Sequence, residues 1–160
     1  MLTPAVYAGS FDPVTNGHID IIRRARNVFG AVIVLVMPNA CKRPLFTAQE
    51  RVELLGQVLQ GEENVRVEAA EGLLADYLKK NGLNVLVRGL RGEGDLEREL
   101  INAYYNKQFY APAETVFLPG RPEYAFLSSS SVREAFSYGA DVSGLVPPCV
   151  AEALRRKKRP

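Results

Sequence analysis

The fold is decided by the stretch Tyr7-Ala8-Gly9-Ser10-Phe11-Asp12-Pro13-Val14-Thr15-Asn16-Gly17-His18. It connects an apolar segment typical of a strand to a segment with helical apolar spacing, through a loop rich in glycine and hydroxyl groups. The first N–H groups of a helix have no partner inside the helix, and the helix dipole is positive at that end. Such a junction binds anions such as phosphates. His18, the only histidine in the chain, would begin the helix and face them.

Beyond this junction, apolar β-branched runs alternate with helical patterns. Residues 32–36 are apolar throughout, as in strands of a parallel sheet that is covered on both faces. The alternation predicts strands at 5–9, 31–37, 65–69, 85–87 and 115–118, and helices at 17–29, 48–59, 73–80, 95–109 and 150–156. We therefore expect an α/β fold with a Rossmann-like, doubly wound, parallel five-stranded sheet and helices on both faces.

Two helix starts and two helix ends can be located from capping residues. Thr47-Ala48-Gln49-Glu50 and Ser131-Val132-Arg133-Glu134 both have the form of a capping box. Gly82 and Gly139 each follow a predicted helix end, where glycine is favoured.

Length and composition favour one globular domain over residues 1–160. The chain is 47% hydrophobic and 24% charged, which argues against disorder, and its longest apolar run is far too short to span a membrane. The N-terminus has neither the basic nor the apolar segment of a secretory signal. Cys41 and Cys149 have no metal-binding spacing, so we expect reduced thiols in a soluble cytoplasmic protein without a membrane partner.

The charge is concentrated at the C-terminus. Residues 155–159 supply five of the 20 cations, which leaves 15 cations against 18 acids in the rest of the chain. A basic run can bind RNA or a membrane, but it also complements the negative end of a last helix. We favour the second interpretation, a basic helix or tail from about residue 150 and no nucleic-acid partner.

Polar clusters follow four of the five predicted strands. Alone, each has an ordinary explanation: a histidine at a helix start is commonly a partly exposed polar residue, serines commonly cap helices, and cations in loops are commonly surface charges. Because the carboxyl ends of parallel strands share one edge, however, together they predict one crevice for a ligand with several phosphates. The clusters are Ser10 with His18, Lys42 with Arg43, Arg88-Gly89-Leu90-Arg91, and Ser128 to Ser131 with Arg133. The chain has no Walker-type loop and no G-x-G-x-x-G motif.

Two of these segments resemble motifs of a known superfamily. Gly9-Ser10-Phe11-Asp12-Pro13 with Thr15-Asn16-Gly17-His18 resembles the T/H-x-G-H motif of nucleotidyltransferases, and Leu127-Ser128-Ser129-Ser130 resembles their I-S-S-S/T motif. Arg88-Gly89-Leu90-Arg91, Lys42 and the length of 160 residues narrow the resemblance to the bacterial phosphopantetheine adenylyltransferases.

The chain departs from that family's pattern at two places. Family members usually carry small apolar residues after the arginine pair, where this chain has Gly92-Glu93-Gly94-Asp95-Leu96. This loop is more flexible and more acidic, which bears on the placement of Arg91 and Glu99. Ser10 stands where threonine is commoner and keeps the hydroxyl.

The resemblance implies transfer of AMP from ATP to 4′-phosphopantetheine, giving dephospho-coenzyme A and pyrophosphate, by direct in-line displacement. It implies catalytic roles for His18, Lys42 and Ser10, acceptor binding by Ser10, Lys42, Leu74 and Arg88, Mg²⁺ carried by the ATP phosphates rather than by a protein site, and a homohexamer. The implied ATP-binding residues are Ser10, Phe11, His18, Gly89, Leu90, Arg91, Glu99, Tyr124, Ala125, Phe126, Leu127, Ser128, Ser129 and Ser130.

Two alternatives remain open from the sequence. One is a related nucleotidyltransferase with another acceptor, such as nicotinamide mononucleotide. The other is a non-catalytic nucleotide- or RNA-binding module that uses the basic tail.

Overall fold

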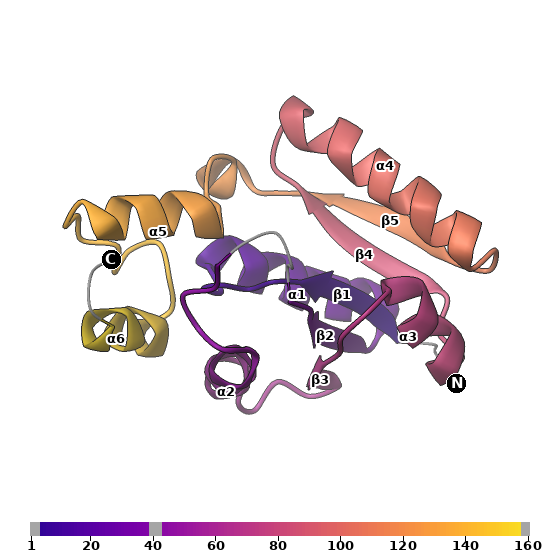
Figure 1. The fold of residues 1–160 in the computed structure, drawn as a ribbon, viewed down its shortest axis with the longest axis horizontal. Helices are drawn as coiled ribbons and strands as arrows, with labels where there is room; N and C mark the ends of the chain where they lie inside the picture. The colour runs from indigo at the N-terminus through magenta and orange to yellow at the C-terminus, as the bar shows by residue number, and fades with distance from the viewer. Residues whose placement is uncertain (1–3, 39–42, 158–160) are drawn as a thin grey trace.

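A computed structural model describes residues 4–38 and 43–157. Its centre is a five-stranded parallel sheet with the strand order β3-β2-β1-β4-β5 (Figure 1). The strands are β1 (Ala5–Gly9), β2 (Val32–Val36), β3 (Val65–Ala69), β4 (Val85–Leu90) and β5 (Glu114–Pro119). Strand order reverses between β1 and β4, and this is the place where open α/β sheets bind ligands.

Helices cover both faces of the sheet, which confirms the predicted doubly wound fold (Figure 1). Inward-facing residues of α1, α2, α5 and α6 form one hydrophobic cluster with β1 and β2, and α3 closes a second cluster on the other face. The α-helices are α1 (Asn16–Phe29), α2 (Ala48–Val58), α3 (Leu74–Asn81), α4 (Glu93–Phe109), α5 (Ser129–Ser137) and α6 (Pro148–Arg156), and a short 3₁₀ helix, η1, spans Pro122–Tyr124.

Three predicted boundaries differ by two or more residues: the end of β4, the start of α4, and the start of α6, which begins at Pro148 instead of residue 150. Strand β4 continues through Arg88, Gly89 and Leu90, so these residues belong to the strand and do not follow it. Helix α4 begins at Glu93, two residues before the predicted start.

The predicted capping box that begins at Ser131 is wrong. Helix α5 starts three residues earlier, because the Ser128 side chain accepts the backbone N–H of Ser131 at 3.0 Å. The Ser131 hydroxyl also accepts the backbone N–H of Ser128 at 3.0 Å, so Ser131 is the third helical residue of a capping box based on Ser128. The capping box at Thr47 and the glycine cap at Gly82 are confirmed.

Glycine is required where β4 crosses α1. A Cβ built on Gly89 would lie 2.9 Å from Cγ1 of Ile21, closer than carbon atoms pack. The backbone of β4 therefore approaches α1 directly, and this contact fixes the floor of the crevice between β1 and β4. Within residues 4–38 and 43–157, no helix has the length and apolar character needed to cross a bilayer.

Candidate active site

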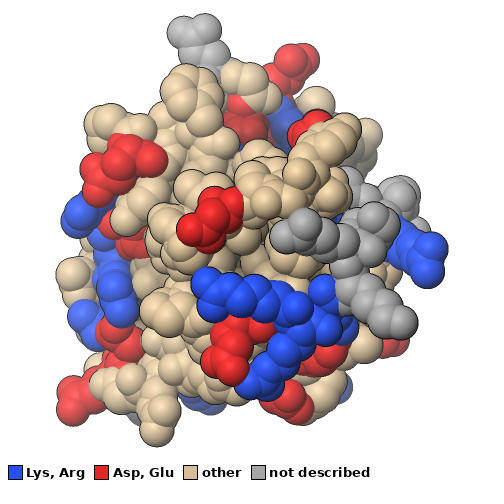
Figure 2. Space-filling model, turned by 90° about the vertical axis from the view of Figure 1, so that its left-hand side faces the viewer, with Lys and Arg blue, Asp and Glu red and all other residues tan. Residues whose placement is uncertain are grey.

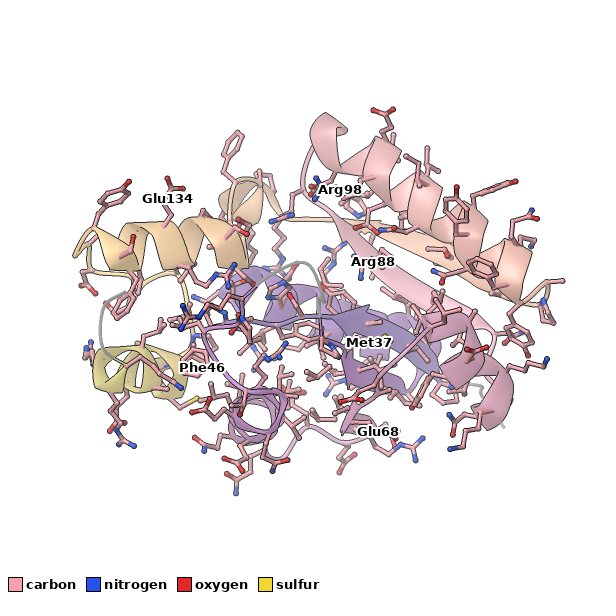
Figure 3. The ribbon with its side chains drawn as sticks, viewed as in Figure 1. Met37, Phe46, Glu68, Arg88, Arg98 and Glu134 are labelled. Atoms are coloured by element: carbon pink, nitrogen blue, oxygen red, sulfur yellow. The ribbon has the colours of Figure 1, made fainter. Side chains whose placement is uncertain are left out.

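A cavity of about 640 Å³ opens at the carboxyl ends of β1 and β4, and this size is typical of ligand-binding pockets. Residues from the β1–α1 loop, β4, α4, and the segment from η1 into α5 line it. Figure 3 shows Arg88 on β4 and Arg98 near the beginning of α4 on this side of the molecule. Three of the predicted clusters therefore contribute to one cavity at this edge of the sheet: Ser10 with His18, Arg88 with Arg91, and Ser128 to Ser130.

Three rings form one wall of the cavity. The Tyr7 and Phe11 rings meet edge to face with centroids 5.3 Å apart, and Phe11 meets the His18 imidazole in the same way at 5.1 Å. Phe11 has a left-handed backbone, with φ of 47°, a strained conformation for a bulky residue. A Cβ on Gly9 would lie 3.1 Å from the Phe11 ring, so glycine there leaves room for it.

Ser10 is held from outside the cavity by a buried arginine. Arg51 of α2 donates from Nη1 to the Ser10 carbonyl at 2.8 Å and from Nε to the Thr47 carbonyl at 3.2 Å. These bonds fix the loop backbone, because Arg51 presents its donors in a rigid planar fork. Ser10 itself lines the cavity.

The His18 ring is oriented by the start of its own helix. Its Nδ1 accepts the backbone N–H of Thr15 at 3.0 Å, and the Thr15 hydroxyl lies 3.1 Å from the same nitrogen. This pairing completes a capping box in which His18 takes the place usually held by glutamate or glutamine. With Nδ1 occupied as an acceptor, the proton of the neutral imidazole is on Nε2. His18 therefore presents an N–H donor.

Burial and two nearby cations keep that imidazole neutral. Loss of hydration, then the charges of Arg91 and Arg88, lower the pKa of His18 to about 3. At neutral pH His18 is thus a hydrogen-bond donor and has no proton to give up as an acid. A bound polyanion would offset the two guanidinium charges.

Arg88 is held in place by α4. Its Nε and Nη2 donate to the two carboxylate oxygens of Glu99 at 2.6 and 2.8 Å, and Nη1 donates to the Ala8 carbonyl. Burial alone would lower the pKa of Arg88, but the hydrogen bonds and charge of Glu99 outweigh it and the pKa is raised. The remaining N–H groups of this charged fork can bind an anion.

Arg91 is oriented by two partners near the opposite rim. Its Nε donates to Asp95 at 2.9 Å and its Nη1 to the Leu127 carbonyl at 3.0 Å. The second bond connects the end of β4 to the segment that leads into α5. Arg91 therefore lies beside the N-terminus of α5, where Ser128, Ser129 and Ser130 line the cavity.

The first turn of α5 supplies main-chain donors. Ser128 caps the helix through Ser131, while the Ser129 hydroxyl donates to the Pro13 carbonyl at 2.8 Å and connects α5 to the β1–α1 loop. The backbone N–H groups of the first helical residues have no partner inside a helix, so this end of α5 attracts negative charge.

Most of the predicted site residues line this cavity, and a few do not. Those that do are Ser10, Phe11, His18, Leu74, Arg88, Gly89, Arg91, Glu99, Tyr124, Leu127, Ser128, Ser129 and Ser130. Leu90, Ala125 and Phe126 are not among the lining residues, and Phe126 is 96% exposed. Lys42 lies outside the described residues.

Arg133 belongs to the framework, although the sequence placed it with the phosphate-binding clusters. Its Nη1 donates to Oδ2 of the buried Asp12 at 2.9 Å. It also contacts the carbonyl of the exposed Arg43 at 3.5 Å. Arg133 does not line the cavity.

Sequence reasoning missed Tyr7 and one face of α4. Arg98, Asn102 and Asn106 line the cavity and recur every four residues, so they share one side of the helix. This four-residue spacing of polar side chains was the sequence signal that could have identified them as one cavity-facing side of the helix. Tyr7 lies inside an apolar strand, and no local pattern distinguishes it from a core residue.

The acidic residues of the cavity are already paired with cations. Asp95 binds Arg91, Glu99 binds Arg88, and Asp20 binds Arg24 and Arg121. Among the described residues no three metal-binding side chains gather. The three acidic side chains of the cavity are therefore already engaged by arginines.

The described part of the basic C-terminus forms ion pairs within the molecule. Lys157 binds Glu50 at 2.8 Å and lies over the Phe46 ring, and Arg156 binds Glu152. Figure 2 views the end of the molecule that carries α5 and α6, and shows positive and negative side chains intermixed there. Solvated ion pairs therefore account for Arg156 and Lys157.

The fold and the site define a nucleotidyltransferase: residues 6–135 match the family model described as cytidylyltransferase-like, and the chain belongs to this family. Within this family, the chain is similar along nearly its whole length to phosphopantetheine adenylyltransferases. The enzyme of that name from Heliobacterium modesticaldum is 49% identical over 98% of this chain and 93% of its own length. Those from Dictyoglomus thermophilum and Thermotoga neapolitana are 50% and 49% identical over 96% of this chain and 93% and 95% of their own lengths.

Proposed function

We propose that this protein transfers AMP from ATP to 4′-phosphopantetheine, giving dephospho-coenzyme A and pyrophosphate in coenzyme A biosynthesis. One observation carries the proposal: His18, Arg88, Arg91 and the N-terminus of α5 meet in one cavity at the β1–β4 switch point. The substrates follow from relatives of that activity at about half identity over nearly the whole chain.

The reaction is a direct displacement at phosphorus. An oxygen of the acceptor phosphate forms a bond to the α-phosphorus of ATP, the bond from that phosphorus to the bridging oxygen breaks, and pyrophosphate leaves with the electron pair. A phosphomonoester has its second pKa near 6, so at neutral pH the nucleophile needs no general base. The protein's contribution is orientation and stabilisation of charge.

We assign His18 to stabilising the charge that develops in this step. Its Nε2–H donates to an oxygen of the transferred phosphate, and Nδ1 stays bonded to Thr15. Because the imidazole is already oriented, the bond strengthens as negative charge grows on that oxygen without rearrangement of the site.

The other site residues hold the two substrates. We assign Ser10 to orienting the phosphate of the incoming phosphopantetheine, and Arg88 to holding the same phosphate. We assign Lys42 to bridging this phosphate and the phosphate that is transferred. Arg91 and residues 128–130 receive the β and γ phosphates. Main chain near Gly89 and residues 124–127 binds the adenosine, and Leu74 borders the pantetheine arm.

Magnesium enters with the nucleotide in this proposal. Mg²⁺ usually keeps several waters and binds substrate phosphates with few protein ligands. When bound, it would neutralise charge on the triphosphate, while Arg91 and α5 position the same phosphates. We place the reaction in the cytoplasm, because both substrates are anions that do not cross a bilayer unaided.

We also propose that the protein assembles as a homohexamer through α4. The outer side of this helix carries six large apolar residues that are each 41% to 59% exposed, and soluble monomers rarely expose such a contiguous surface. They are Leu96, Leu100, Ile101, Tyr104, Tyr105 and Phe109. Light scattering coupled to size exclusion gives the mass directly, and Ile101→Glu should yield a smaller species; a monomeric wild-type protein contradicts the proposal.

A panel of acceptors tests the reaction. Purified protein with ATP and Mg²⁺ is given 4′-phosphopantetheine, nicotinamide mononucleotide or glycerol 3-phosphate, and pyrophosphate release is measured. We expect release with phosphopantetheine only. Release with another acceptor places the chain in a sister activity, and release with none contradicts the proposal.

A further inference from the structure

Tyr7 lines the cavity, and the proposed reaction assigns no role to its hydroxyl. It lies at the centre of β1, it is 6% exposed, and it is among the residues that line the cavity. Its ring is held edge to face by Phe11, and the His18 ring lies beyond with centroids 6.4 Å apart. A tyrosine this buried ordinarily satisfies its hydroxyl with a hydrogen bond.

Within the described residues, the Tyr7 hydroxyl has no hydrogen-bond partner, although side-chain polar atoms sealed away from solvent there all have one. The hydroxyl is therefore not sealed in the core, and Tyr7 is among the residues that line the cavity. By contrast, Tyr77 of α3, which packs against the second hydrophobic cluster, donates its hydroxyl to Glu68 at 2.6 Å. Among the residues that the structure describes, none accepts the proton of the Tyr7 hydroxyl, so this donor is available to a ligand.

The surroundings of Tyr7 select an anion. The charges of Arg88 and Arg91 favour negative charge at the hydroxyl, and the Glu99 carboxylate, which is paired with Arg88, opposes them less strongly. The His18 ring is also close, with its centroid 6.4 Å from that of Tyr7. Burial raises the pKa of Tyr7 to about 12 in spite of these two cations, so the hydroxyl keeps its proton at every working pH. It can donate a hydrogen bond, and it cannot serve as a base. Hydrogen bonds from such donors to charged oxygens are the strong ones.

We propose that the Tyr7 hydroxyl donates a hydrogen bond to the phosphate that His18 faces, the group transferred from ATP. Tyr7 then joins His18 as a second side-chain donor to that phosphate. The inference rests on the proposed function for the identity of the nucleotide, and on the cavity geometry for the contact itself.

Tyr7→Phe is the sharp test, because it removes one oxygen and leaves the ring that Phe11 packs against. We expect kcat to fall about 10- to 100-fold, the usual effect of losing a hydrogen bond to a charged group, and KM for phosphopantetheine to change less than about threefold. Tyr138→Phe is the matched control, since Tyr138 is 84% exposed and lies outside the cavity; it should leave kcat unchanged. Thermal melts of both variants verify folding.

A binding measurement separates this inference from the proposed reaction. ATP titrated calorimetrically into Tyr7→Phe should bind about 3- to 10-fold more weakly than to wild type, whether or not phosphopantetheine is the acceptor. Wild type and Tyr7→Phe, both labelled at tyrosine Cζ, give a second reading, because ATP should shift the tyrosine signal that is missing from the variant. Unchanged kcat and ATP affinity overturn the inference, and an effect confined to KM for the acceptor overturns the assignment to the transferred phosphate. Failure of wild type to use phosphopantetheine contradicts only the proposed function.

Discussion

Asp12 and Arg133, which are 121 residues apart in the chain, form an ion pair with 2.9 Å between Oδ2 and Nη1. The Asp12 carboxylate is buried and also accepts the backbone N–H groups of Leu45 and Phe46, each at 2.8 Å. One carboxylate therefore joins the β1–α1 loop, the segment before α2, and helix α5. Phe46 in turn packs near α6 (Figure 3).

Asp12→Ala should lower the free energy of unfolding by about 3–5 kcal/mol, because it leaves a partly buried guanidinium and two backbone donors without their acceptor. Urea denaturation measures the loss. Arg156→Ala is the control: its ion pair with Glu152 is exposed, and such pairs contribute little. Equal midpoints for the two variants would contradict the assigned role.

The pKa of His18 should be directly observable, since the chain has a single histidine. Its Cε1 proton signal in NMR should show no titration between pH 8 and about 4, because the folded-state pKa is about 3. Pyrophosphate should raise that pKa by neutralising Arg91 and Arg88. A free enzyme whose histidine titrates near 6.5 would mean that the ring is hydrated and unpaired.

The same shift makes stability depend on pH. The unfolded chain takes up a proton on His18 as the pH falls through 6.5, whereas the folded chain does so only near 3. The contribution of the neutral ring to stability is complete above about pH 6.5 and is lost progressively below it.

Replacing His18 by alanine should reduce kcat about 10²–10³-fold, the usual loss for one donor to a transition state. It should also cost about 1 kcal/mol of stability, because Thr15 loses the partner of its backbone N–H in the capping box. Single-turnover kinetics and thermal melts measure the two effects separately. Full activity in a folded variant would remove His18 from the mechanism.

Arg88→Ala should weaken phosphopantetheine binding more than ATP binding, because its fork is assigned to one phosphate. Calorimetric titrations with each substrate measure the two affinities. Arg98→Ala is the control, because it removes another arginine that lines the cavity. Glu99→Gln should produce part of the Arg88 effect, since Glu99 orients the guanidinium at 2.6 and 2.8 Å. Equal losses for both substrates would show the assignment to be wrong.

Gly89→Ala should destabilise the protein by about 1–3 kcal/mol, because the added methyl group would lie 2.9 Å from the Ile21 side chain. Combining it with Ile21→Ala should recover part of the loss. Gly56 gives the matched control in the interior of α2, where a Cβ meets nothing within 4 Å and alanine should stabilise by about 0.5–1 kcal/mol. Identical melts for the two alanine variants would contradict the crowding argument.

The sequence was sufficient for the fold because parallel strands that are covered on both faces are apolar throughout, as in residues 32–36, and because glycine and hydroxyl residues identified the turns. The predicted strand at 85–87 ends three residues too early, because Arg88 interrupts the apolar run. In the fold, Glu99 neutralises that charge across the strand-to-helix contact, and pairing continues to Leu90.

The candidate site was predictable where a motif and a strand end coincide, as at Ser10 and His18. It was not predictable where a choice depends on a distant partner. Local capping rules allow α5 to begin after Ser128 or after Ser131, and they favour the two starts equally. In the structure the helix begins after Ser128, and the hydroxyl of Ser129 donates to the distant Pro13 carbonyl. Arg133 reads as a phosphate-binding cation until Asp12 is placed beside it.

The two nitrogens of the His18 imidazole have different roles: Nδ1 caps the start of α1, and Nε2 is left for a ligand in the cavity. Selection for folding and selection for chemistry therefore act on the same ring. A descendant of this protein that had abandoned its reaction would still gain from retaining a histidine at that position. The hydroxyls of Ser10 and Tyr7 cap no helix, so in such a descendant we expect them to be lost before His18 is.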